Sequence, residues 1–118
     1  MLFFKDICKN SETLGMENGK ILDSQIAASS HWNDLPDPAT ARLNSKQTGM
    51  GAWSAGKNDV NQWIQVDFKN QAIVTNILTQ GRNSTTFYQW VKSYTVYYSI
   101  DGIHFTPYQK LGEVKVIF

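Results

Sequence analysis

The chain has 118 residues, a length typical of one domain, and a net charge of +1, which gives no basic field for binding nucleic acid. Hydrophobic residues make up 42% of it and charged residues 18%, so its composition excludes a disordered chain and allows a buried core. Aromatic residues reach 13%, a share that favours a β-sandwich or barrel, in which wide side chains cross between sheets.

Cys8 is the single cysteine, which leaves open a free thiol, a partner on another chain, or a partner outside this sequence. The two histidines, His31 and His104, lie in no sequence signature with Cys8, so we expect no Cys–His nucleophile. The apolar residues 1–4 are too short for a signal peptide, and no apolar run approaches transmembrane length. Either the protein is not secreted or this chain is a fragment of a longer one.

The stretch 51–68 predicts the central strand of the fold. Ile64, Val66 and Phe68 alternate with polar residues, the period-2 pattern of a half-buried strand. The polar cluster 56–59 before them is a turn. Because the rest of the chain reads as strands laid beside this one, we take it as the organising element.

Further segments rich in β-branched and aromatic residues predict more strands, at 25–30, 72–80, 90–100 and 114–118. Asp101-Gly102 is a strong hairpin signal, with the return strand starting at Ile103. Helical periodicity and a fixed repeat are both lacking. The sequence therefore predicts an all-β antiparallel sandwich or jelly roll.

Three loops carry large apolar residues where polar ones are usual. They are residues 29–40, which contain two prolines, residues 45–51 and residues 81–89. Their apolar residues are Trp32, Leu35, Met50, Phe87 and Tyr88. For Trp32 and Leu35, two interpretations stay open: they pack under their loop, or they stand exposed as a binding surface.

Two polar residues invite a structural and a functional interpretation. Arg42 is expected to tie loop carbonyls or a carboxylate with its guanidinium, with a phosphate contact as the alternative. Asn83-Ser84-Thr85 is an acceptor sequence for N-glycosylation at Asn83 if the protein is secreted.

The chemistry of catalysis is not evident in the sequence. It has no phosphate-binding glycine loop, no histidine pair at metal spacing and no nucleophile–base–orienter set. A structural calcium ion held by Asp34, Asp37 or Asp59 stays open, and no other cofactor is expected. These features favour binding over catalysis, and we expect no enzyme activity.

Seven ordered blocks of sequence resemble discoidin domains, also called coagulation factor V/VIII type C domains. The blocks are 14–19, 23–26, 41–44, 61–67, 79–82, 90–94 and 98–102. The resemblance covers residues 8–118, with residues 1–7 as an N-terminal extension. It implies an extracellular module with a galactose-binding-like jelly roll of roughly eight strands in two sheets.

The resemblance also implies that three loops at one end of the barrel contact the ligand. In this sequence they offer His31, Trp32, Asn33, Leu35, Lys46, Gln47, Thr48, Met50, Thr86, Phe87 and Tyr88. Cys8 stands where the family has the first cysteine of a disulfide, and the second is missing from this chain, as are the closing C-terminal strands.

Three functions follow from the resemblance. The first is cell adhesion by recognition of a glycan (galactose-type) or a glycoprotein, with Trp32, Phe87 or Tyr88 stacked on a sugar ring. The alternative is binding to a phosphatidylserine membrane through apolar loop tips, as in the blood-clotting relatives. The third is recognition of a protein such as collagen or a growth factor. We place the glycan first, because Asp34 and Asp37 would be repelled by an anionic membrane.

Overall fold

The computed structural model describes residues 12–33, 38–45 and 51–117. Over these ranges the chain forms strands and two short 3₁₀ turns but no α-helix, which confirms the all-β class. The turns are η1 (Asp23–Gln25) and η2 (Pro38–Ala41). The strands are β1 (Ile26–Ala28), β2 (Ile64–Val66), β3 (Tyr94–Thr95), β4 (Tyr97–Tyr98), β5 (Thr106–Pro107), β6 (Gln109–Lys110), β7 (Glu113–Val114) and β8 (Val116–Ile117).

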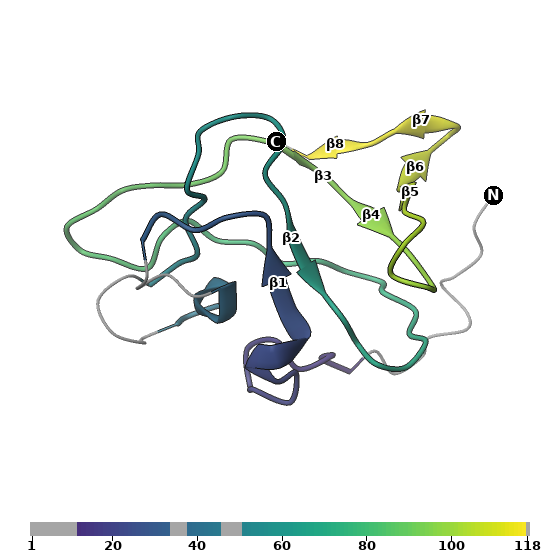
Figure 1. Ribbon diagram of the computed structural model, residues 1–118, viewed down its shortest axis with the longest axis horizontal. Helices are drawn as coiled ribbons and strands as arrows, with labels where there is room; N and C mark the ends of the chain where they lie inside the picture. Colours follow the sequence, from purple (N-terminus) through teal and green to yellow (C-terminus); the bar gives the residue numbers. More distant parts are fainter. Residues whose placement is uncertain (1–11, 34–37, 46–50, 118) are drawn as a thin grey trace.

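All strand pairs among the described residues are antiparallel. β1 pairs with β2, so that Ile26 lies opposite Val66. β3 pairs with β8, β4 with β5, and β6 with β7. Figure 1 shows β1 and β2 side by side at the centre, the short C-terminal strands at the upper right and long connecting segments at the left.

The small core lies beneath the β1–β2 pair. Ile21, Ile26 and Ala39 are the hydrophobic residues buried within the described ranges, and Val66 and Phe68 pack against them. This contact confirms that Val66 and Phe68 face inward, as the alternation predicts. Strand β2 therefore organises the part of the chain that is packed.

Arg42 ties three segments of the amino-terminal half together. Its Nη1 donates to the carbonyl of Met16 at 2.6 Å, and its Nη2 donates to the carbonyl of Ile21 at 2.7 Å and to Asp23 Oδ1 at 2.6 Å. The guanidinium is the donor that suits this task, since its fork reaches several acceptors at once. The structural interpretation of Arg42 is thus confirmed.

β4 and β5 form the hairpin predicted around Asp101-Gly102, but the return strand starts at Thr106 rather than at Ile103, because residues 99–105 form a longer loop. Gly102 has φ +71°, the left-handed region that such a turn requires. The carboxylate of Asp101 accepts hydrogen bonds from the backbone N–H groups of Ile103 and His104, both at 2.8 Å, and from Ser99 Oγ. Its second oxygen lies 2.7 Å from His104 Nδ1.

This network makes the hairpin sensitive to acid. The hydrogen bonds from His104, then those from Ile103 and Ser99, hold the pKa of Asp101 well below the usual value of about 4. A lowered pKa gives stability that is present above pH ~4 and is lost as the pH falls through the lower, folded-state value. We expect Asp101→Asn to be less stable than the wild type at pH 6, and the difference in urea midpoint to shrink on acidification below pH ~4. A constant difference over this range would contradict the assignment.

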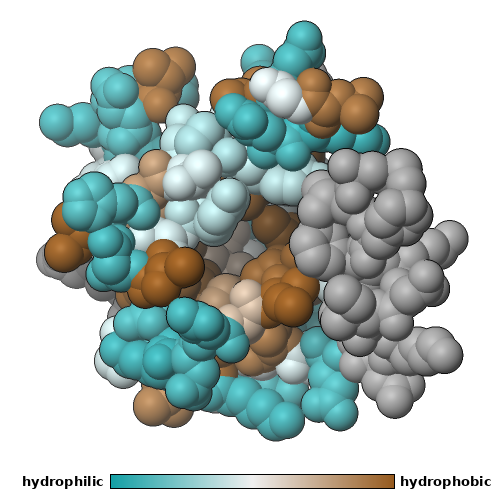
Figure 2. All heavy atoms as spheres, turned by 90° about the vertical axis from the view of Figure 1, so that its right-hand side faces the viewer, coloured by the Kyte–Doolittle hydropathy of each residue, from teal (hydrophilic) through white to brown (hydrophobic). Residues whose placement is uncertain are grey.

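Two predicted strands differ from the structure. Residues 72–80 lie in no strand, although their β-branched residues are typical of one, because a strand needs a partner backbone and none of the described segments pairs with them. The strand predicted over 90–100 is limited to β3 and β4. Many large side chains consequently stay exposed, among them Ile77, Leu78 and Trp90. Figure 2 shows hydrophobic residues gathered around a hollow on one face.

Candidate binding surface at the loop end

The first loop is fixed at its start to the segment that follows the second loop. The backbone N–H of Trp32 donates to the carbonyl of Ser54 at 2.9 Å. The indole Nε1 of Trp53 donates to the carbonyl of Ser30, also at 2.9 Å, and the Ser30 hydroxyl accepts from the Gly56 N–H at 3.0 Å. The backbone at Ser30 and Trp32 is therefore held against residues 53–56.

The second and third loops are joined at their bases. Asn83 N–H donates to the carbonyl of Gly51 at 3.1 Å, and its side-chain Nδ2 donates to the carbonyl of Ser45 at 3.3 Å. The Asn44 N–H donates to Gln80 Oε1 at 3.0 Å. Residues 30–33, 44–45, 51–56 and 80–89 thus form one end of the molecule, which we call the loop end (Figure 1, left).

The third loop is closed by its own hydrogen bonds. The backbone N–H of Arg82 donates to the carbonyl of Gln89 at 2.7 Å, and its Nη1 donates to Gln89 Oε1 at 2.7 Å. At the tip, the hydroxyl of Ser84 accepts from the N–H groups of Thr86 and Phe87, each at 3.1 Å. The Arg82 guanidinium lies over the ring of Phe87, with 4.4 Å from Cζ to the centroid, a cation–π contact.

Large aromatic side chains are exposed on this fixed backbone. Trp32 is 68% exposed, Phe87 53% and Tyr88 79%. Of the two interpretations of Trp32, exposure is therefore the one that the structure supports. His31, Asn33 and Thr86 are exposed as well, and His31 Nδ1 lies 2.6 Å from the Asn33 carbonyl oxygen.

Several expected residues lie outside the described ranges. They are Cys8, Leu35, Lys46, Gln47, Thr48 and Met50. Nothing in the structure therefore bears on their predicted roles. The described part of the loop end consists of the start of the first loop, the third loop, and the residues on either side of positions 46–50 in the second loop.

Replacing Gly51 with alanine tests the junction between the second and third loops. Gly51 has φ +62°, and a Cβ there would overlap the Asn83 carbonyl. Gly112, with φ +81° and open space around it, is the matched control for backbone strain alone. We expect Gly51→Ala to lower the free energy of unfolding by about 1–3 kcal/mol more than Gly112→Ala, measured by chemical denaturation. Equal losses would mean that the junction is loosely packed.

The calcium site that the sequence left open has no support among the described residues. No group of three or more His, Cys, Asp or Glu within the ranges described lies close enough to hold a metal ion. Asp59 accepts from Gln62 Nε2 and from the Asn61 N–H, each at 2.8 Å, and these bonds lower its pKa. Its carboxylate therefore closes a turn, while Asp34 and Asp37 lie outside the described ranges.

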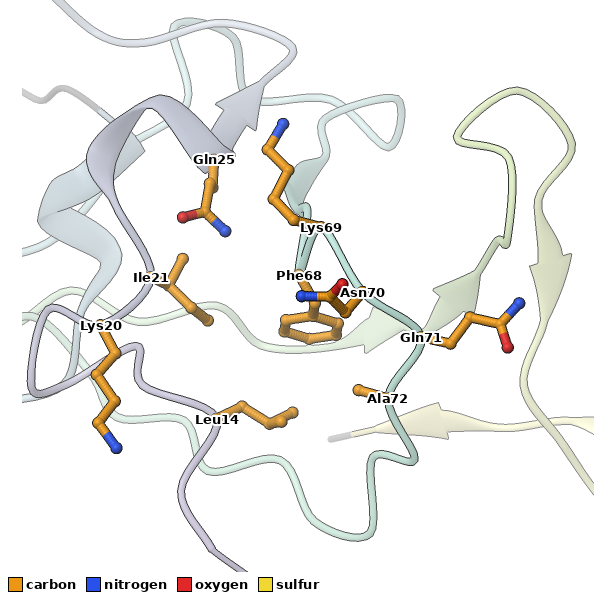
Figure 3. Close-up of a pocket in the computed structure, with 9 residues that line it drawn as sticks. All are labelled: Leu14, Lys20, Ile21, Gln25, Phe68, Lys69, Asn70, Gln71 and Ala72. Atoms are coloured by element: carbon orange, nitrogen blue, oxygen red, sulfur yellow. The ribbon is translucent and has the colours of Figure 1, made fainter.

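One hollow among the described residues lies away from the loop end. It measures about 450 Å³ and is lined by Leu14, Ile21, Phe68 and neighbouring residues. Figure 3 shows the Phe68 ring in its middle, while the amino groups of Lys20 and Lys69 point outward. The hollow is lined by apolar residues and by the polar side chains of Gln25, Asn70 and Gln71, and it contains none of the predicted site residues.

Sequence reasoning missed the side chains that fix the loops. The side chains of Ser30 and Gln80 each join segments more than twenty residues apart, as does the backbone carbonyl of Gly51, and Ser30 Oγ also bonds Gln62. Asn83 was noted only as a glycosylation acceptor. Gly51, at the end of the second loop, was a signal of this junction in the sequence, because glycine is common where two backbones approach closely.

Comparison with known proteins agrees with this architecture. The model of the F5/8 type C domain family matches residues 25–116, so the chain belongs to that family, whose domains are extracellular binding modules with a β-sandwich fold. The four antiparallel strand pairs described above are consistent with such a fold.

Individual relatives are similar over most of the chain. It is 44% identical to human coagulation factor V over 113 residues, which is 92% of the chain and 5% of the relative. It is 46% identical to the human EGF-like repeat and discoidin I-like domain-containing protein 3 over 105 residues, 84% of the chain and 22% of that protein. Rat lactadherin is 42% identical over 112 residues, 90% of the chain and 26% of lactadherin. The chain thus spans about a quarter or less of these relatives.

Within the residues described, no helix is long and apolar enough to cross a membrane.

Proposed function

We propose that this chain is an extracellular, non-catalytic module that attaches to an anionic phospholipid membrane through its loop end. The observation that carries the proposal is the exposure of Trp32, Phe87 and Tyr88 on backbone that hydrogen bonds hold in place. Exposed aromatic side chains on a rigid scaffold lose little conformational freedom when they bind.

The burial of these side chains supplies enough free energy for reversible attachment. Each side chain that enters the acyl region contributes about 1.5–3 kcal/mol. Three of them supply about 4.5–9 kcal/mol before the cost of association is subtracted, so we expect weak, reversible attachment. Trp and Tyr also favour the interface between headgroup and acyl chain, since their rings are apolar and their tips polar.

Arg82 supplies a positive charge next to the inserting residues. Its guanidinium lies over the Phe87 ring, so a ring that enters the membrane would bring the charge to the level of the lipid phosphates. The net charge of the chain is only +1, so its electrostatic attraction to the membrane comes from local charges. We expect binding to increase with the content of anionic lipid and to decrease as added salt screens these charges.

We rank the membrane ahead of the glycan, which reverses the order expected from the sequence, for two reasons. A sugar needs a concave site with convergent polar groups, and the best-defined hollows of the described residues lie elsewhere. The similarity to coagulation factor V also favours the membrane, because the resemblance drawn from the sequence implied membrane binding in the clotting relatives.

Recognition of a galactose-type glycan is the second candidate. Tyr88 presents 79% of its surface to solvent beside the polar residues Thr85 and Thr86. A free aromatic face next to hydroxyl groups is suited to stacking on a sugar ring.

Sedimentation with vesicles separates the two candidates. The secreted chain is mixed with phosphatidylcholine vesicles that contain or lack phosphatidylserine, with and without galactose. We expect binding to the anionic vesicles, little to the neutral ones, and no competition by galactose. Retention on a galactose resin together with no sedimentation on either vesicle would overturn the membrane proposal in favour of the glycan.

A further inference from the structure

The acceptor sequence Asn83-Ser84-Thr85 lies at the centre of the loop end. Asn83 is exposed, and its Nδ2 reaches across to the Ser45 carbonyl at the border of the second loop. Phe87 follows on the same loop, with its backbone N–H on the Ser84 hydroxyl. An attachment at Nδ2 would therefore start at the junction of two loops that carry the candidate binding residues.

We propose that Asn83 carries an N-linked glycan and that this glycan weakens attachment through the loop end. The regulatory half of this inference rests on the proposed function. The amide Nδ2 of Asn83 attacks the first sugar carbon of an oligosaccharide that is carried on a lipid pyrophosphate. The new N–C bond forms, the C–O bond to the pyrophosphate breaks, the lipid pyrophosphate leaves, and one amide proton is released.

The local structure is compatible with this modification. A glycosylated amide keeps one N–H, so a hydrogen bond to the Ser45 carbonyl remains available. The transfer precedes folding in the secretory pathway, and the exposed position of Asn83 gives the glycan a path into solvent after folding.

The glycan would occupy space that a membrane surface needs in order to reach the loop end. It is bulky and hydrated, and it would stand at the base of the loop that presents Phe87 and Tyr88. A membrane must approach these rings closely to bury them, so hydrated sugar between the surfaces opposes insertion. Neither ring needs to be displaced for this effect.

Two substitutions at Thr85 test the inference without changing Asn83. Thr85→Ala removes the acceptor sequence and Thr85→Ser keeps it, and both retain the backbone carbonyl that accepts from the Tyr88 hydroxyl. Each chain is secreted from eukaryotic cells, treated or not with an N-glycosidase, and weighed by mass spectrometry. Binding to vesicles containing phosphatidylserine is then measured for each.

We expect the wild type and Thr85→Ser to lose mass on deglycosylation, and Thr85→Ala to be unchanged. Thr85→Ala, which keeps Asn83 without a glycan, should reach half-saturation at a several-fold lower vesicle concentration than the wild type and Thr85→Ser. A wild type without a mass change would overturn the modification. Equal binding by glycosylated and unglycosylated chains would overturn the regulation. Absence of binding by every chain would overturn the proposed function and the regulation with it, while the mass change stands separately.

Discussion

Replacing Arg42 with alanine should unfold much of the amino-terminal half of the chain. Only 11% of the Arg42 side chain is exposed, and its guanidinium satisfies the carbonyls of Met16 and Ile21. Ile21 belongs to the small core, so the loss of its partner disturbs the packing as well as the hydrogen bond. Removing one partner of such a buried charged network costs about 3–5 kcal/mol. Because whole domains have about 5–15 kcal/mol, this is a large share of the stability.

Two control variants separate the carbonyl contacts from the ion pair. Asp23 is 61% exposed, so Asp23→Ala should cost less than about 1 kcal/mol. Arg42→Lys keeps the charge but loses the fork, and it should fall between the two. Urea denaturation followed by tryptophan fluorescence measures all three. A loss for Asp23→Ala as large as that for Arg42→Ala would show that the ion pair, rather than the carbonyls, carries the effect.

The double substitution Trp32→Ala, Phe87→Ala should abolish most of the attachment to anionic vesicles. If each side chain contributes at least about 1.5 kcal/mol by burial, the pair is worth about 3 kcal/mol, or roughly 100-fold in affinity. Both side chains are exposed in the free protein, so their loss should leave the urea midpoint nearly unchanged. The measurement is the vesicle concentration at half-saturation.

Leu111→Ala is the matched control for loss of an exposed apolar side chain. Leu111 is 97% exposed in the turn between β6 and β7, away from the loop end (Figure 1). It should bind as the wild type does. If the double variant also binds as the wild type does, the loop end is not the attachment surface.

Local patterns predicted the features whose causes are local. The alternation of Ile64, Val66 and Phe68 predicts β2, and Val66 and Phe68 face the core, whereas Ile64 is exposed. Asp101-Gly102 predicts a hairpin from turn chemistry, although its return strand starts at Thr106 rather than Ile103. The structural role of Arg42 was predictable, because an arginine between loops can donate hydrogen bonds to backbone carbonyls that have no backbone N–H partner.

Contacts between distant segments left no signal in the sequence. The bond from Asn83 Nδ2 to the Ser45 carbonyl joins residues 38 apart, and an asparagine in a polar loop gives no indication of its partner. Residues 72–80 show the converse: their composition is typical of a strand, yet strand formation depends on a neighbour that composition does not reveal.

The position of β1 and β2 in the chain has a consequence for thermal behaviour. The first two loops both lie between these strands, and the ladder that closes this long excursion has only three residue pairs. The hairpins β4–β5 and β6–β7 join strands that are close in sequence, so they form without the β1–β2 ladder. Fraying of the central ladder on mild heating would therefore release both loops at once, so attachment should disappear at a lower temperature than the hairpins melt.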